Sequence, residues 1–270
     1  MTLRSALLRT IFVSALIPAA AMAGDPTAAV SDTTATMIGL GGSADGRATE
    51  ALGGSVSIPV THAIGAQLDA SLSRAGTTNG GDAGVHLFTR DPESYLVGTT
   101  FEWTRFGNTS AFRYGVEGAA YLGDFNLGAA GGLQRGGGNK GATSAGFASL
   151  QADYYVDTRL KTSIAFGGYS SYRTVLGEVE WQPSQTMPFS MFLDAGAAVA
   201  TEKHGIILAG LRYTFGAPAS TIKDRDRHGD PEPLLISGTT SGGLVGNTTA
   251  LQGIHTAPAA APTSPVKIAS

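Results

Sequence analysis

The sequence predicts an all-β fold: a transmembrane antiparallel up-and-down β-barrel of about 12 strands with a disordered C-terminal tail. Glycine makes up 38 of 270 residues, about 14%, where about 7% is usual, and charged residues make up only 14%, where about 25% is usual. Apolar and polar residues alternate along most of the chain, yet beyond the N-terminal segment no run approaches the ~20 apolar residues of a membrane helix. A barrel fits these observations, because one face of each strand contacts lipid and needs no charge.

The first 23 residues have the pattern of a secretory signal peptide. Arg4 and Arg9 give a basic start, a short apolar run follows, and small residues surround a cleavage site. We expect Sec-type export with cleavage near Ala23/Gly24. The alternative is an N-terminal membrane anchor.

Residues 24–32, directly after this segment, are a polar lead-in. The composition of the chain after the signal peptide limits the functions that we expect. The 18 basic residues less the two in residues 1–23 leave 16, against 21 acidic residues. Nucleic acid is not an expected partner, since its binding needs a basic patch. With no cysteine, an exported chain of this kind has no disulfide and depends on burial or on a membrane for its stability.

Strict alternation over residues 33–216 predicts the barrel strands. In the stretch 95–106, for example, Val97 and Phe101 point to one face and Glu102 to the other. The breaks in this pattern predict strands at 33–42, 50–60, 64–75, 83–89, 95–106, 111–122, 125–135, 144–156, 158–170, 172–182, 188–200 and 204–215.

The links between these strands alternate in kind. One set is tight, as in "RDPE" and "DT", and the other includes longer glycine-rich links such as "GTTNGGD" and "GGGNKGAT". Short periplasmic turns and longer external loops are the usual asymmetry of such barrels, so we expect residues 76–82 and 136–143 at the cell surface. An even number of strands places both ends of the barrel domain on the same side.

The last predicted strand carries a resemblance. The signal peptide, the glycine-rich alternating strands and the terminal "LRYTFG" with Tyr213 and Phe215 resemble small porin-like outer-membrane barrels of Gram-negative bacteria. The resemblance covers about residues 33–216. It implies a location in the outer membrane, contact with outer-membrane lipid, and a strand-terminal aromatic, Phe215, that the barrel-assembly machinery reads during biogenesis. In this chain 54 residues follow Gly216.

The polar face of the strands is expected to line the lumen, because a charge at the bilayer midplane costs about 2–4 kcal/mol. Seven acids and four bases then face inward, which favours cations weakly if water passes. The candidates are Asp69, Glu102, Arg113, Glu117, Asp153, Arg159, Lys161, Glu178, Glu180, Asp194 and Arg212.

Several functions remain open at this point. The first is a small general diffusion pore with a weak cation preference. The second is a structural or interaction barrel with a filled lumen, in which loops or the tail bind a periplasmic or surface partner. A soluble secreted barrel of lipocalin type comes last, because its exterior would carry too few charges.

Large aromatic residues lie near the predicted strand ends on the apolar face. Rings at that depth form interfacial girdles in membrane barrels. The candidates are Tyr95, Trp103, Tyr114, Tyr154, Trp181 and Tyr213.

No catalytic group, metal site or cofactor is predicted. The five histidines lie outside any recognisable nucleophile or metal spacing, and neither G-x-S-x-G nor H-E-x-x-H is present. An outer-membrane hydrolase is the minor alternative, through His86 and a hydroxyl or carboxylate across the barrel.

Residues 217–270 form the predicted tail, which either hangs in the periplasm or folds into the lumen. Its first part, "STIKDRDRHGDPEP", is interpreted as a solvated mixed-charge linker. The remainder is rich in Pro, Ala, Thr and Gly, a composition that cannot bury a core and predicts disorder.

Overall fold

The computed structural model describes residues 28–44, 46–138, 141–169, 172–199, 203–216 and 221–229. The predicted signal peptide and the part of the predicted tail from residue 230 onward lie outside these ranges. All twelve predicted strands are present, and one short helix follows them. The elements are β1 (Thr34–Ala44), β2 (Arg47–Pro59), β3 (Ile64–Ala75), β4 (Thr78–Asp91), β5 (Tyr95–Phe106), β6 (Thr109–Leu122), β7 (Phe125–Gly138), β8 (Gly141–Tyr155), β9 (Leu160–Tyr169), β10 (Tyr172–Trp181), β11 (Phe189–Val199), β12 (Lys203–Phe215) and α1 (Ile222–His228).

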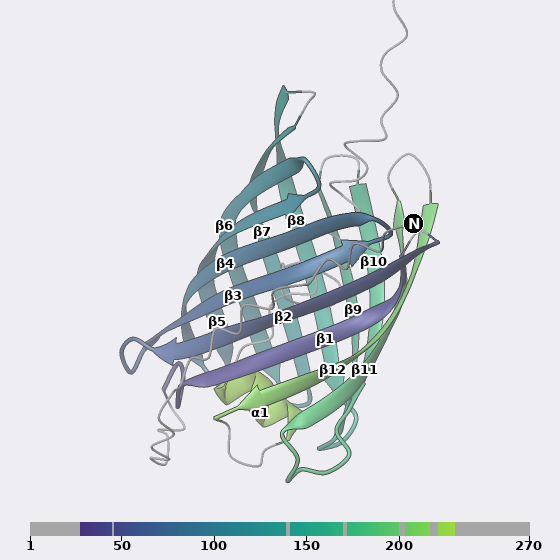
Figure 1. Ribbon diagram of the computed structural model, residues 1–270. Coiled ribbons are helices and arrows are strands. Elements are labelled where there is room, and N and C mark those ends of the chain that lie inside the picture. The colour runs from purple at the N-terminus through teal and green to yellow at the C-terminus, as the bar shows by residue number, and fades with distance from the viewer. Residues whose placement is uncertain are drawn as a thin grey trace, which may run out of the picture.

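The strands form a closed up-and-down barrel, which confirms the predicted fold class. Each strand pairs antiparallel with its neighbours in sequence, and β1 closes the sheet by pairing with β12 as well as β2 (Figure 1). The register of the closing pair sets Ala35 opposite Phe215 and Ala44 opposite Ile206. Because β1 begins and β12 ends at the same end of the barrel, we call this end the α1 mouth and the opposite end the far mouth.

The predicted difference between short and long links is wrong. At most three residues separate consecutive strands at the far mouth, where the glycine-rich loops were expected, and two to seven separate them at the α1 mouth. Residues 78–82 and 136–138 belong to strands, because backbone pairing with a neighbouring strand outweighs the low strand propensity of glycine. Gly76 and Gly107 occupy two-residue turns with φ of 58°, the left-handed conformation that such turns require.

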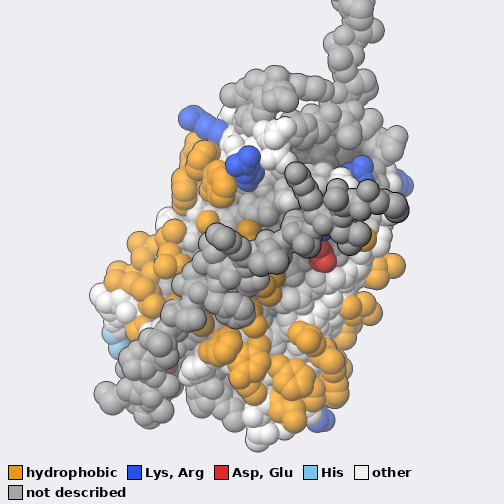
Figure 2. All heavy atoms as spheres, in the orientation of Figure 1, with side chains coloured by type: hydrophobic (Ala, Val, Ile, Leu, Met, Phe, Trp, Pro, Cys, Tyr) orange, Lys and Arg blue, Asp and Glu red, His pale blue; other side chains and the backbone are white. Residues whose placement is uncertain are grey.

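The outer surface of the barrel is apolar. Large side chains such as Leu72, Val116 and Ile207 are 62% to 72% exposed and point away from the lumen. Hydrophobic side chains gather over the visible outer face (Figure 2). None of the described helices is long and apolar enough to cross a membrane.

The lumen contains an apolar core on one side. It consists of inward-pointing residues of β1, β9, β10, β11 and β12, of which Leu176, Phe192 and Leu208 are at most 4% exposed. Buried polar groups line the inward face of β3 to β8 and also lie on β9 to β12, and groups from both sets form the candidate site.

Candidate functional site

Helix α1 lies inside the α1 mouth of the barrel (Figure 1). A capping box begins it: the Thr221 hydroxyl accepts a hydrogen bond from the backbone N–H of Asp224, and the Asp224 carboxylate accepts one from the N–H of Thr221. Ile222, Asp226 and Arg227 are buried. The prediction of a solvated linker is therefore wrong for this segment, because its charges meet partners on the barrel wall instead of water.

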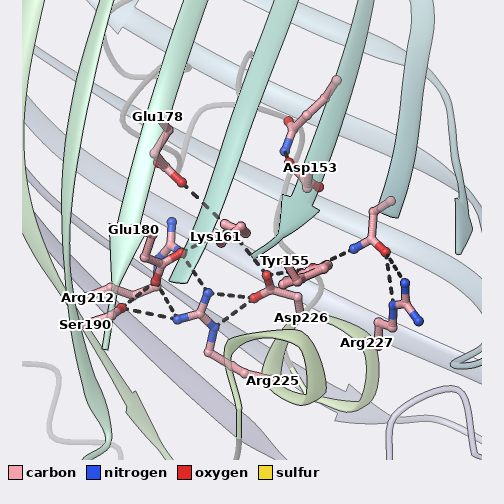
Figure 3. A network of polar contacts seen from close by, with 12 residues as sticks. Asp153, Tyr155, Lys161, Glu178, Glu180, Ser190, Arg212, Arg225, Asp226 and Arg227 are labelled. Carbon is pink, nitrogen blue, oxygen red and sulfur yellow. Dashed lines mark hydrogen bonds and ion pairs between the residues drawn. The ribbon is translucent and has the colours of Figure 1, made fainter. Parts of the chain in front are cut away.

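Arg225 and Asp226 attach α1 to the wall through a set of ion pairs that we call the mouth cluster (Figure 3). The two terminal guanidinium nitrogens of Arg225 donate to the two oxygens of Glu180, at 2.7 and 3.0 Å. Nζ of Lys161 lies 3.0 Å from Glu180 Oε2 and 3.3 Å from Asp226 Oδ2. The full cluster is Lys161, Glu178, Glu180, Ser190, Arg212, Arg225 and Asp226.

Glu180 is the centre of the mouth cluster. Its side chain is fully buried and also accepts a hydrogen bond from Arg212, at 2.6 Å. In the register of the sheet, Glu180 lies opposite Lys161 of β9, so the two wall partners of the helix are neighbours in the same ladder. A buried carboxylate with several cationic partners is stable only while these partners stay in place.

Arg227 occupies a cradle on another part of the wall. Its guanidinium donates to Asn126 Oδ1 at 2.8 and 3.0 Å and to the backbone carbonyls of Gly123 and Phe125 at 2.9 and 3.1 Å. It also lies over the rings of Tyr121 and Tyr155, 5.0 and 5.8 Å from their centroids.

The end of α1 and the segment before β1 are held together by one wall residue, Arg90 of β4. Its guanidinium donates to the carbonyl of Ala29 at 2.7 Å and to that of Gly229 at 3.0 Å. Val30 is fully buried and packs against Phe88 in a small apolar cluster. Residues 28–30, part of the predicted polar lead-in, are thus buried inside the barrel and form the plug together with α1.

A second group of charges, the mid-lumen cluster, lies wholly on the wall. His86 lies between two carboxylates, with Nε2 at 2.8 Å from Asp69 Oδ2 and Nδ1 at 2.9 Å from Glu117 Oε1. Arg113 pairs with Glu102, its direct neighbour in the ladder, at 3.2 Å. The cluster consists of Asp69, Asp82, His86, Glu102, Arg113 and Glu117, four acids against one arginine and one histidine.

A small cavity of about 50 Å³ lies between the mid-lumen cluster and α1, lined among others by His86, Glu117, Asp153 and Asp226. A space of this size has room for several ordered water molecules beside the polar side chains that line it. The plug and the wall side chains therefore leave only a small polar space in this part of the lumen. Among the described residues, no group of three or more His, Cys, Asp or Glu side chains is arranged to hold a metal ion.

The comparisons with known proteins concern the fold. Neither the protein-family models nor the curated proteins gave a match. Among solved structures, the COG4313 outer membrane channel from Pseudomonas putida F1 is similar with a TM-score of 0.51 and 14% identity, over 71% of this chain and 97% of that one. A KdgM porin in complex with disordered oligogalacturonate has a TM-score of 0.50 and 11% identity, over 67% of this chain and 99% of that one.

The chain has the fold of a porin-like outer-membrane barrel. At these identities the likeness concerns the fold alone. The function of this porin-like barrel must be inferred from the residues of its own lumen.

The structure places most of the predicted lumen-lining residues inside the barrel. Nine of the eleven are buried and point inward, and Glu117 is partly buried beside His86. Arg159 is a correction: it lies exposed in the turn before β9 and donates to the carbonyl of Pro183. The alternation was extended one residue too far, past the start of the strand at Leu160.

The predicted lumen-lining set left out three inward polar residues of β4, namely Asp82, His86 and Arg90, although His86 was considered as a group that could meet a carboxylate across the barrel. The signal was available, because Val85 and Leu87 alternate with them as outward residues. The strand was predicted to begin at residue 83 and end at residue 89, which left Asp82 and Arg90 in links.

The predicted interfacial aromatics divide by depth. Tyr95, Tyr154, Trp181 and Tyr213 are exposed on the outer face near the α1 mouth, as is Phe215, whose ring lies 4.5 Å from that of Tyr213. Two others differ: Trp103 lies toward the far mouth, and Tyr114 lies mid-strand, opposite Phe101 and Leu133. Alternation indicates the face of a residue but not its depth, so Tyr114 does not belong to an end girdle.

Proposed function

We propose that this chain is an outer-membrane pore with a weak cation preference, and that its own α1 closes the pore at the α1 mouth. The observation that carries the proposal is that a helix outside the sheet, and not the strands themselves, fills the α1 mouth. The barrel combines an apolar exterior with a lumen rich in buried charges, and what fills the α1 mouth is a helix connected to the wall chiefly by polar contacts. A polar interface can be exchanged for water when the helix leaves.

The mid-lumen cluster supports the cation preference. Its four carboxylates outnumber Arg113 and His86 whether or not the histidine is protonated. Helix α1 carries Lys223, Arg225 and Arg227 against two aspartates, so its departure removes one net positive charge from the lumen. The open wall is therefore more acidic than the closed one, and rings of acidic side chains favour cations.

The outer membrane is the proposed location, reached by Sec-type export and insertion by the barrel-assembly machinery. The apolar exterior supports lipid contact, and the exposed Phe215 at the end of β12 supports its proposed role as an assembly signal. With both ends of the barrel at the α1 mouth, we propose that this mouth faces the periplasm.

A second candidate is a structural barrel whose lumen stays filled. The complete burial of Lys161 and Glu180 favours it, because separating a buried ion network is costly. The two candidates differ in one observable, which is ion flow.

The test is planar-bilayer conductance of the mature chain beside a version ending at Gly216, both checked for barrel insertion. The proposal predicts sparse steps for the mature chain and frequent steps for the shortened one. The reversal potential in a salt gradient should have the sign of cation selectivity. Two inserted but silent proteins would support the structural barrel instead.

A further inference from the structure

The cradle around Arg227 is built from neutral groups. Its acceptors are one amide oxygen and two backbone carbonyls, and two tyrosine rings face the guanidinium. Arg227 is only 4% exposed, and no carboxylate among the described residues forms an ion pair with it. A buried cation without a carboxylate depends on shape and on acceptor direction, so the cradle is specific for the group it holds.

That group is a guanidinium by geometry. A planar guanidinium presents five N–H donors in a fixed fork and stacks on aromatic faces, whereas an ammonium is a compact and strongly hydrated point charge. Here three oxygens accept four hydrogen bonds from two nitrogens of Arg227, and the rings of Tyr121 and Tyr155 supply the aromatic faces.

Tyr155 of β8 and Asp226 of α1 fix the orientation of the Asn126 amide in the cradle. Asn126 Nδ2 donates to the Tyr155 hydroxyl at 2.6 Å, and this hydroxyl donates to Asp226 Oδ2 at 3.0 Å. These contacts hold the Asn126 amide with its oxygen toward the guanidinium. Gly123 lies in the two-residue turn between β6 and β7, and Phe125 is the first residue of β7, so the paired strands that flank the turn fix where these two carbonyls lie.

We propose that this cradle is a binding site for guanidinium-bearing solutes, such as free arginine or arginine-containing peptides, and that Arg227 occupies it in the closed barrel. As a statement of what the pore recognises, the proposal rests on the proposed function. The binding itself does not require conduction. In the open barrel the site faces the α1 mouth, and Glu180, two strands beyond β8, offers a charged position for a second guanidinium where Arg225 now lies.

The test uses the full mature chain with Arg227→Ala. This change removes the guanidinium and leaves Arg225, Lys161 and Arg90 to hold the helix. Ethylguanidinium reproduces the deleted part of the side chain, and ethylammonium is the matched control. Binding is measured in detergent as the rise in thermal unfolding temperature with ligand concentration.

The expected result is that ethylguanidinium binds about tenfold more tightly than ethylammonium. Only the guanidinium stacks on the two rings and presents its N–H donors in a planar fork. Adding Asn126→Ala to the variant should abolish the preference. Equal effects of the two cations, or a preference that survives Asn126→Ala, would overturn the proposal. If Arg227→Ala does not fold alone, the folded fraction recovered on refolding with each cation gives the same comparison.

Failure of this proposal is distinguishable from failure of the pore. A folded Arg227→Ala barrel that does not bind ethylguanidinium but conducts ions refutes the proposed site and supports the pore. A barrel that binds ethylguanidinium but never conducts keeps the site and refutes the pore.

Discussion

The mouth cluster and the mid-lumen cluster contain similar numbers of buried charges, but they are assembled differently. Every member of the mid-lumen cluster belongs to β3, β4, β5 or β6, so the register of adjacent strands brings them together. The mouth cluster joins β9, β10, β11 and β12 to α1, and two of its seven members, Arg225 and Asp226, come from the helix. The first cluster is fixed once the barrel closes, whereas the second loses two of its members if one short helix moves.

The difference teaches where a pore of this kind can be gated. Charges held by the strand ladder cannot move without breaking the barrel, since each strand pairs on both sides. Charges on a helix attached by side chains can leave together. Among the described residues, the charges of the lumen that lie outside the strand ladder are those of α1, which is the element we propose to move.

The largest expected effect in this comparison is that of Glu180→Ala. The change removes the shared partner of Lys161, Arg212 and Arg225, and we expect a loss of about 3–5 kcal/mol in the free energy of unfolding, as for other broken buried ion pairs. Urea unfolding in detergent, followed by tryptophan fluorescence, measures it.

Glu102→Ala is the matched control in the mid-lumen cluster. It affects mainly Arg113, which keeps its hydrogen bonds to Gln134, so we expect a smaller loss of about 1–3 kcal/mol. Equal losses in the free energy of unfolding for the two variants would contradict the central role of Glu180 in the mouth cluster.

The next largest effect concerns the apolar outer surface of the barrel. Val116→Arg places a charge on the outer surface of β6 near mid-strand, at a cost of about 2–4 kcal/mol if that surface contacts lipid. We expect impaired insertion into lipid vesicles, measured by the shift of the folded barrel on unheated gels. Ile164→Arg should behave alike, and Val116→Leu should insert normally; normal insertion of both arginine variants would mean that the apolar face does not contact lipid.

The smallest effect belongs to the helix alone. Thr221→Ala removes the hydroxyl of the capping box and should destabilise α1 by about 1 kcal/mol, while the mid-lumen cluster stays unchanged. Hydrogen exchange should become faster at the amide of Asp224, which loses its acceptor, and stay the same in the strands. Thr221→Ser keeps the hydroxyl and should match the natural chain, and faster exchange throughout the barrel would contradict a local role.

The barrel could be predicted from the sequence because its strands show the same alternation throughout, and Glu102 and Arg113 were both placed on the inward face by that alternation. The plug could not be predicted in the same way. Thr221 and Asp224 carried a capping signal at the correct spacing, but the alternating charges of the segment are equally typical of a solvated linker. Only the structure, with α1 inside the mouth, shows that Arg225 contacts Glu180, 45 residues away in sequence. Partners so distant leave no local pattern.

The most direct test of the account removes the side chains by which α1 contacts the mouth cluster and the Arg227 cradle, and leaves the barrel complete. Arg225→Ala, Asp226→Ala and Arg227→Ala are combined in the full mature chain, and single-channel currents are recorded in planar bilayers beside the natural chain. The account predicts that the triple variant opens at least tenfold more often, with cation-selective steps, while both proteins insert equally. Inserted triple-variant barrels that remain as silent as the natural chain would contradict the claim that α1 closes a pore.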